Sequence, residues 1–345
     1  MPINIDGSKG IRQNTTEVTK IPVGTTAQRP ANPEAGMIRF NTDDGQIEGW
    51  DAVANEWRDI NKITGVVASG GTVTDIEQGG QLFRVHTFTS DGTFEVVRSG
   101  GEVEYLVVAG GGGGGGTDDN YGGGGGAGGL VFSSADLNTQ SYNVVVGSGG
   151  LGARNTSTRV GGNGGNSEAF GAVALGGGGG GSQDSSVVGQ DGGSGGGGPF
   201  AIAGGTGLQP SSASGGFGNN GGAGNSSTNA SGGGGGAGSA GFSENSSIPF
   251  GGEGRDYSDK FGTNVGDDGF FASGGGGVTA RGSGGTFYPP PHKGGGAGAI
   301  NFSNSSEPNE PGMDNTGGGG GGGTDAGPGG QNGGSGIVVI RYRIG

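Results

Sequence analysis

The sequence predicts an all-β protein, in which a short amino-terminal β-hairpin arm precedes a glycine-rich domain capped by β-strands. Three observations predict this fold class. Glycine accounts for 98 of the 345 residues, two strongly apolar segments flank the glycine-rich region, and the amino-terminal part alternates apolar and polar residues as a hairpin does. Only 14 glycines precede position 110, so the glycine is concentrated in the carboxyl-terminal two thirds of the chain.

The composition leaves two interpretations of the glycine-rich region. Hydrophobic residues make up 28% and charged residues 14% of the chain, and both fractions are low for a globular domain. A flexible Gly/Ser linker is one interpretation. However, the chain also has 15 Phe, 6 Tyr and 2 Trp, whereas disordered chains are usually poor in aromatic residues. These rings need a packed environment and favour an ordered domain.

The first 62 residues form the predicted arm. Residues 37–41 and 46–50 each alternate apolar and polar side chains, and Thr42–Gly45 between them has a glycine where a hairpin turn requires positive φ. Residues 56–60 predict a further strand that brings the two tryptophans together. A hairpin of this size is marginal alone, so we expect the arm to oligomerise or to dock on a neighbouring protein.

Connector strands are expected over residues 63–81, and the glycine-rich domain over residues 82–345. Strands separated by glycine-containing turns are predicted at 63–67, 72–76, 82–88, 93–97 and 102–108. Residues 102–109 and 336–344 are apolar enough to be buried strands. We expect these two strands to pair and to close the glycine-rich region between them.

Long glycine tracts such as Gly110–Gly116 can be ordered only by their own amide groups. Fixing each residue costs about 1 to 2 kcal/mol, and glycine has no side chain to bury in return. Extended helices of the polyproline II type point every N–H and C=O outward, so many tracts together can bond one another. We therefore expect a bundle of polyglycine II helices, stabilised by many hydrogen bonds of about 0.5 to 1.5 kcal/mol each.

A recurring unit lies within this region: Gly-Gly-Gly-Ala-Gly is followed four residues later by Phe-Ser at three positions. The unequal spacing of the copies argues against a solenoid with a fixed period. We expect the alanines to face out of the lattice and the phenylalanines to seal its edge. The residues concerned are Ala127, Ala237, Ala297, Phe132, Phe242 and Phe302.

Several function classes are disfavoured. The net charge of -14 and the 17 scattered Lys and Arg residues argue against nucleic-acid binding. The chain has no cysteine and only two histidines, His86 and His292, and no glycine run ends in Gly-Lys-Ser/Thr. We therefore expect no enzyme activity, no cofactor and no metal. The amino-terminal segment lacks the pattern of a signal peptide, so we expect no cleavable export signal.

Three acidic pairs leave alternatives open: Asp43–Asp44, Asp118–Asp119 and Asp267–Asp268. Such pairs in glycine-flanked loops can bind calcium or act as the carboxylates of a glycosidase. Solvated turns are the simpler interpretation.

Aromatic residues in loops between the tracts are the candidate binding residues. A ring that stacks on a sugar, with Asn, Asp and Ser nearby, is a common way for loops on a rigid scaffold to bind surface saccharide. The alternative is that these rings only cover the ends of the bundle. The candidates are Tyr121, Phe200, Phe217, Tyr257, Phe261, Phe270, Phe271, Phe287 and Tyr288.

The amino-terminal residues carry a resemblance. Ile21–Pro30, Pro33–Asn41 and Glu48–Asp51 resemble a short module found in tail-fibre and other structural proteins of tailed bacteriophages. This resemblance implies that residues 1–62 attach the chain to a virion or to another fibre protein. Fibres of this kind are commonly trimers, so a homo-oligomer, and specifically a homotrimer, is expected.

The remainder of the chain carries a second resemblance. His86–Phe94, Val103–Gly116 and the closing segment Gly333–Tyr342 are similar to the glycine-rich domain of phage fibres and adhesins. The resemblance implies a structural protein of the virion whose polyglycine II bundle displays loops for host attachment. Partners would be other tail proteins and a host-surface polysaccharide or outer-membrane protein. Two alternatives remain: a virion decoration protein that binds no receptor, and a depolymerase.

Overall fold

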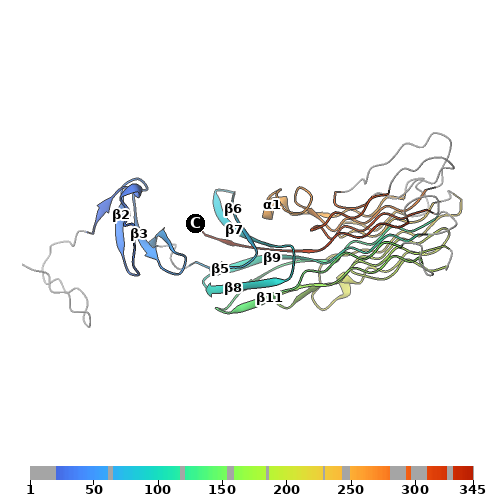
Figure 1. Ribbon diagram of the computed structural model, residues 1–345, viewed down its shortest axis with the longest axis horizontal. Coiled ribbons are helices and arrows are strands. Elements are labelled where there is room, and N and C mark those ends of the chain that lie inside the picture. The colour runs from blue at the N-terminus through green and yellow to red at the C-terminus, as the bar shows by residue number, and fades with distance from the viewer. Residues whose placement is uncertain are drawn as a thin grey trace, which may run out of the picture. The chain divides into compact units, whose positions relative to one another are not determined.

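The structure is a computed structural model, and it describes the chain in two compact units, Met1–Thr64 and Gly65–Gly345 (Figure 1). The described residues are 21–60, 65–116, 121–153, 159–183, 186–227, 230–242, 249–279, 293–296, 309–324 and 329–344. Strands dominate both units, which confirms the all-β class.

The first unit is a four-stranded sheet in the order β1-β2-β3-β4. Its strands are β1 (Val23–Gly24), β2 (Ile38–Asn41), β3 (Gln46–Asp51) and β4 (Glu56–Asp59). A 3-10 turn at Thr26–Gln28 follows β1. The predicted hairpin is confirmed: β2 and β3 are antiparallel, and Gly45 in their turn has a φ of 66°. The rings of Trp50 and Trp57 lie 5.9 Å apart in an edge-to-face arrangement, as the sequence predicts.

The second unit is built on a five-stranded antiparallel sheet in the order β10-β9-β16-β7-β6. Its strands are β6 (Thr72–Gln78), β7 (Gln81–Phe88), β9 (Glu102–Val108), β10 (Leu130–Asp136) and β16 (Ile337–Arg343). The carboxyl-terminal strand β16 is central and pairs with β9, with Val339 opposite Leu106. The predicted closure of the glycine-rich region by these two strands is therefore confirmed.

Smaller elements flank this sheet. A three-stranded sheet has the order β11-β8-β5. The smaller elements are β5 (Val67–Ser69), β8 (Gly92–Arg98), β11 (Ser141–Val144), the pair β12 (Ser167–Ala169) and β13 (Ala172–Ala174), a 3-10 turn (Gln209–Ser211), the pair β14 (Arg255–Asp256) and β15 (Phe270–Phe271), and the short helix α1 (Ser258–Phe261).

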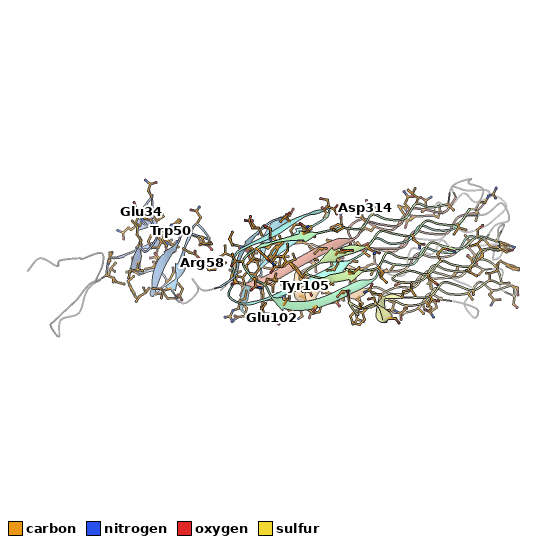
Figure 2. All side chains as sticks on the ribbon, turned by 90° about the horizontal axis from the view of Figure 1, so that it is seen from below. Glu34, Trp50, Arg58, Glu102, Tyr105 and Asp314 are labelled. Carbon is orange, nitrogen blue, oxygen red and sulfur yellow. The ribbon has the colours of Figure 1, made fainter. Side chains whose placement is uncertain are left out.

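Both faces of β9 and β16 at the centre of the five-stranded sheet are buried, which explains why these strands are continuously apolar. On β9, Val103, Tyr105 and Val107 point into one cluster, together with residues of β8 and β11. Leu106 and Val108 point into a second cluster, which the segment around α1 covers. Successive side chains of a strand point to opposite faces, and here both faces are apolar, so polar and apolar residues do not alternate along these strands. Tyr105, labelled in Figure 2, belongs to the first cluster.

His86 is buried in this first layer with every ring nitrogen partnered. Its Nδ1 lies 2.7 Å from the Gly70 carbonyl oxygen, to which it donates, and its Nε2 lies 3.2 Å from the Tyr342 hydroxyl. The Tyr342 oxygen in turn accepts the amide of Ala68. Burial lowers the pKa of His86 below its usual value, because a charged ring would lose its hydration. His86 is thus a neutral structural residue.

This burial predicts a pH dependence of stability. Between the usual histidine pKa of about 6.5 and the lowered pKa of His86 in the folded chain, the unfolded chain binds a proton that the folded chain does not, so the free energy of unfolding should fall with decreasing pH by up to about 1.4 kcal/mol per pH unit. Above that pH the contribution of His86 is constant. Denaturant titrations from pH 5 to 8 should show this slope in the wild type and in His292→Gln, and lose it in His86→Gln. A slope that persists in His86→Gln would contradict the assignment.

The glycine tracts bond one another with a period of three residues. Along Gly110–Gly116, every third amide donates to the same neighbouring tract: residues 110, 113 and 116 donate to 165, 162 and 159. Residues 111 and 114 donate to 334 and 331, and residues 112 and 115 donate to 126 and 123. Three residues per turn is the repeat of the polyproline II helix. The predicted polyglycine II bundle is therefore confirmed.

The carbonyl groups of the same tract bond three further neighbours. The carbonyls of residues 110 and 113 accept the amides of 177 and 180, those of 111 and 114 accept 150 and 153, and those of 112 and 115 accept 320 and 323. The central tract thus has six neighbours, three antiparallel through its donors and three parallel through its acceptors. In Figure 1 the tracts run alongside one another away from the sheet.

Only glycine fits at the centre of this lattice. A Cβ atom built on Gly112 would lie 2.2 Å from the Gly178 carbonyl oxygen, and one on Gly114 would lie 2.0 Å from that of Gly321. Both obstacles are backbone atoms, which cannot rotate away. Figure 2 shows the side chains of this region gathered along its outline and at its right-hand end.

Asparagine side chains complete the lattice at its perimeter. The Oδ1 atoms of Asn163, Asn166, Asn220 and Asn332 each accept a backbone amide, from Gly179, Gly176, Gly207 and Gly152 respectively, at 2.8 to 2.9 Å. In the interior of the lattice such an amide donates to the backbone carbonyl of a neighbouring tract; at the perimeter the asparagine side-chain carbonyl accepts it instead. These backbone amides at the edge of the lattice therefore have a hydrogen-bond acceptor.

The expected outward orientation of the alanines is wrong for the two that the structure describes. Ala127 and Ala237 are almost fully buried, and both belong to the cluster that covers the second face of the sheet. The amide of Ala127 still donates to Gly235 within the lattice. These methyl groups lie where the tracts meet the apolar core, so the lattice has room for a Cβ there. Ala297 lies outside the described residues.

The phenylalanines of the recurring unit differ from one another. Phe132 lies on β10 and packs against the second cluster, with its ring 5.2 Å from that of Tyr257. Phe242 is 44% exposed and packs edge-to-face on Phe250. Phe302 lies outside the described residues. The two described copies therefore do not share a sealing role, because Phe132 continues into a strand of the sheet and Phe242 does not.

Candidate functional site

The course of the chain defines a distal end of the bundle, which is the end away from the five-stranded sheet. The first tract leaves the sheet at Val108 and reaches Gly116, and the next tract returns from Gly122 to Leu130. Gly116 and Gly122 therefore lie at the distal end. In Figure 1 this end of the tracts is on the right.

Two of the predicted site residues meet at the distal end. Tyr121 precedes the returning tract, and Phe200 follows a tract whose Gly197 donates its amide to Gly124. The ring centroids of Tyr121 and Phe200 lie 5.1 Å apart with the planes tilted by 35°. Both side chains are half-buried. They form one aromatic pair on the outer end of a rigid lattice.

Two buried polar groups without a hydrogen-bond partner belong to a segment that contacts the chain neighbours of Tyr121 and Phe200. Ser182 bridges to Gly122, the neighbour of Tyr121, and Gly181 lies against Pro199, the neighbour of Phe200. The Ser182 hydroxyl and the Gln183 side-chain carbonyl have no hydrogen-bond partner. Buried polar groups are nearly always bonded in native proteins, so these two atoms are unusual.

A second aromatic pair at the distal end was not among the predicted site residues. The rings of Phe242 and Phe250 lie 6.2 Å apart. Two hydrogen bonds place this pair near the distal Gly122: the amide of Gly277 donates to Pro249, which precedes Phe250, and the amide of the next residue, Val278, donates to Gly122. Phe242 was expected to seal the lattice edge, and the sequence gives no signal that Phe250 would meet it.

Five other predicted site residues lie at the sheet end of the bundle. Tyr257, Phe261 and Phe271 are buried in the cluster that covers the second face of the sheet, and burial raises the pKa of the Tyr257 hydroxyl. Phe270 lies on β15 with the Lys293 ammonium 5.1 Å from its ring centre. Phe217 bonds to Leu130 and lies 3.6 Å below the Arg255 guanidinium.

The remaining two candidates, Phe287 and Tyr288, lie outside the described residues.

A buried arginine fastens the α1 segment to the sheet. Arg341 on β16 pairs with Glu104 on β9, with Nε 2.6 Å from a carboxylate oxygen. Its Nη1 donates to Gln78 at 2.7 Å and to the Lys260 carbonyl. The guanidinium also lies 4.4 Å from the centre of the Phe83 ring. These contacts make the segment 255–271 a structural cover.

The acidic pairs within the described residues are engaged by cations of the chain itself. Asp268 pairs with Lys293 at 2.7 Å, which raises the pKa of that lysine. Asp44 lies 4.0 Å from Arg29 and accepts the amide of the Asn41 side chain. In the part of the chain that the structure describes, no group of three or more His, Asp or Glu residues could hold a metal. Asp118 and Asp119 fall outside it.

The same described ranges contain no helix that is long and apolar enough to cross a bilayer.

Comparison with known proteins gives one family. Residues 88–343 match the family described as "Glycine-rich domain", a span of more than half of the chain. This span runs from the end of β7 through all of the tracts to β16. No curated protein matches the sequence.

Proposed function

The chain belongs to the glycine-rich domain family, and from this premise we propose that it is a structural protein of a bacteriophage tail fibre that displays loops for binding to a host surface. The proposal makes it a virion component and not an enzyme. Residues 1–62 would join it to other tail or fibre proteins, and the distal end of the bundle would contact a polysaccharide or an outer-membrane protein of the host. The resemblance of Ile21–Asn41 to a tail-fibre module supports the first part.

The observation that carries the proposal is the pairing of Tyr121 with Phe200 at the distal end. Loops on a rigid scaffold are a common location of binding residues. Two half-buried rings offer an apolar surface to a sugar ring or a protein side chain. The lattice holds this arrangement in place, so little order has to be gained on binding.

A second candidate function is a decoration or tail component that recognises no receptor. The hydrogen-bonded bundle favours it equally, because stiffness alone is useful in a virion. The two candidates differ only in whether the distal residues bind a cell surface.

Binding of the labelled full chain to a panel of bacterial strains, measured by flow cytometry, separates the two candidates. We expect binding to at least one strain, and about a tenfold or larger loss when Tyr121 and Phe200 are both changed to Ala, because central aromatic residues dominate binding energies. Leu82→Ala is the matched control, since Leu82 is 41% exposed on β7 at the sheet end.

Equal binding by wild type and the double variant would contradict the distal site. Absence of binding across the panel would favour the decoration protein. On a strain that does bind, competition with its extracted polysaccharide and with its outer-membrane vesicles identifies the class of receptor.

A further inference from the structure

Three of the four perimeter asparagines are followed by glycine. The pairs are Asn163–Gly164, Asn220–Gly221 and Asn332–Gly333, and Asn-Gly occurs nowhere else in the sequence. The fourth asparagine, Asn166, precedes Ser167. Every Asn-Gly pair of the chain therefore lies at the edge of the glycine lattice, with the asparagine Oδ1 bonded to a lattice amide.

Each pair is fastened twice to one neighbouring tract. The side-chain carbonyl of Asn163 accepts the amide of Gly179, and the amide of Gly164 donates to Gly177, which lies two residues earlier in that tract. The other two pairs repeat this arrangement: Asn220 accepts from Gly207 while Gly221 donates to Gly205, and Asn332 accepts from Gly152 while Gly333 donates to Gly150. The bond donated by the glycine of the pair measures 2.9 Å in all three.

The lattice requires glycine after each of these asparagines. A Cβ atom built on Gly164, Gly221 or Gly333 would lie 2.1, 2.0 or 2.2 Å from a backbone carbonyl oxygen of a neighbouring tract, and backbone atoms do not rotate away. The asparagine is required as well, because its side chain accepts an amide at the lattice edge. Packing therefore explains why the two residue types stand together at these three places.

Asn-Gly is the pair in which asparagine loses its side-chain amide most readily. The backbone nitrogen of the glycine attacks the asparagine Cγ, and a bond forms between these two atoms. The bond from Cγ to Nδ2 breaks, and ammonia leaves with the proton of the glycine nitrogen. Water then opens the cyclic succinimide to aspartate or to isoaspartate. Glycine favours the attack because it has no Cβ to hinder the approach and the widest range of backbone angles.

We propose that Asn163, Asn220 and Asn332 are deamidation sites that the lattice keeps closed, so that each one reacts only when its tract separates from the neighbouring tract. The attacking nitrogen must lose its proton and turn toward Cγ, but its N–H is bonded to the neighbouring tract. The Oδ1 bond holds Cγ on that same tract. Water is not limiting, because Asn163 and Asn220 are exposed and Asn332 is half-buried.

The isoaspartate product prevents the tract from returning to its place. Isoaspartate adds a methylene group to the main chain. In a lattice with a repeat of three residues, the residues on either side of this group cannot both bond the same neighbouring tract. A separated tract therefore has a limited time in which to rejoin the bundle.

The test compares deamidation of the native full chain with that of the same chain in guanidinium chloride, at one mildly alkaline pH and one temperature. Peptide mass spectrometry follows each site. In denaturant we expect the three Asn-Gly sites to react faster than Asn166, which has the same side-chain bond in the fold but no following glycine. In the native chain we expect the three sites to react at least about 100-fold more slowly than in denaturant, because the reaction requires local opening.

A native rate close to the denatured rate would overturn the proposal, and so would equal rates at Asn166 and the Asn-Gly sites in denaturant. The inference goes beyond the proposed function and does not depend on it, so a failure to bind cells would leave these rates unchanged.

Two variants in the tract of Asn163 test the link to tract separation. A Cβ on Gly161 would lie 2.0 Å from a backbone oxygen of the central tract, whereas a Cβ on Gly162 would meet no atom closer than 3.2 Å. We expect Asn163 to deamidate in Gly161→Ala at nearly the denatured rate, whether the variant opens locally or fails to fold. In Gly162→Ala we expect the slow rate of the native wild type. Equal rates in the two variants would contradict the proposal.

The product offers a separate readout. A native sample is aged until isoaspartate is detected and is then treated briefly with a protease, which digests open chains and leaves folded ones intact. We expect isoaspartate at the three sites only among the digested chains. Isoaspartate in equal proportion among the resistant chains would show that the lattice accommodates the product, which would overturn this part of the proposal.

Discussion

Replacing Gly112 by Ala should prevent the second unit from folding. The added Cβ would lie 2.2 Å from the Gly178 carbonyl oxygen and 2.5 Å from its carbon, and real contacts of this kind are never so short. Relief requires neighbouring tracts to separate, which breaks several hydrogen bonds of about 0.5 to 1.5 kcal/mol each. We expect a loss of about 4 kcal/mol or more, visible in calorimetry as a lost or strongly lowered unfolding transition.

Two adjacent glycines of one tract provide the control. A Cβ on Gly161 would lie 2.0 Å from the Gly113 carbonyl oxygen, whereas on Gly162 the nearest atom is the Leu151 nitrogen at 3.2 Å. Gly161→Ala should therefore be as damaging as Gly112→Ala, and Gly162→Ala should change stability by less than about 1 kcal/mol. Equal effects at the two positions would show that the tract is not held in this lattice.

Removal of residues 337–345 should abolish folding of the second unit. This segment includes β16 (Ile337–Arg343), which lies between β9 and β7 at the centre of the five-stranded sheet. Ile337 and Val339 belong to one apolar cluster, and Val338, Ile340 and Tyr342 belong to the other. Burial of each large apolar side chain contributes about 1.5 to 3 kcal/mol, so their joint loss exceeds the stability of a typical domain.

The opposite truncation is the control for chain length. Removal of residues 1–64, which form a separate unit, should leave the thermal transition of the second unit within a few degrees of its original temperature. The two truncated proteins are compared by calorimetry. A folded second unit in the absence of β16 would contradict the central place of this strand.

The sequence was sufficient to predict the class of fold, because its signals were local. The alternation around Thr42–Gly45 predicted the hairpin, and the continuous apolar runs of β9 and β16 predicted strands buried on both faces. Their pairing followed from the need to close the region between them. The three-residue period of the tracts followed from the chemistry of a chain with no side chains.

Other features depend on which tracts are neighbours, and the sequence does not contain this information. Ala127 was expected to face outward, yet it lies where the lattice meets the apolar core. The asparagines that accept lattice amides, such as Asn163, resemble ordinary loop residues in the sequence. In a tract, only one side of each residue faces a given neighbour, so one glycine can be replaceable when the next is not.

The candidate site was predictable only in part. Tyr121 and Phe200 are far apart in the sequence and meet because their tracts end at the same level. Loop residues such as Tyr257 and Phe261 have the same composition around them but cover the sheet. Aromatic residues in glycine-rich loops are therefore divided between the distal end and the sheet end by the position of each loop along the bundle, which composition does not reveal.

The most direct test of the account is amide hydrogen exchange of the full chain with glycine selectively labelled by ¹⁵N. The account holds that backbone hydrogen bonds make the tracts one ordered body. The amides of Gly110–Gly116 and Gly122–Gly129 should then exchange at least about 1,000-fold more slowly than free peptide, which corresponds to an opening free energy of about 4 kcal/mol. Exchange at the rate of an unstructured peptide in these tracts would contradict it.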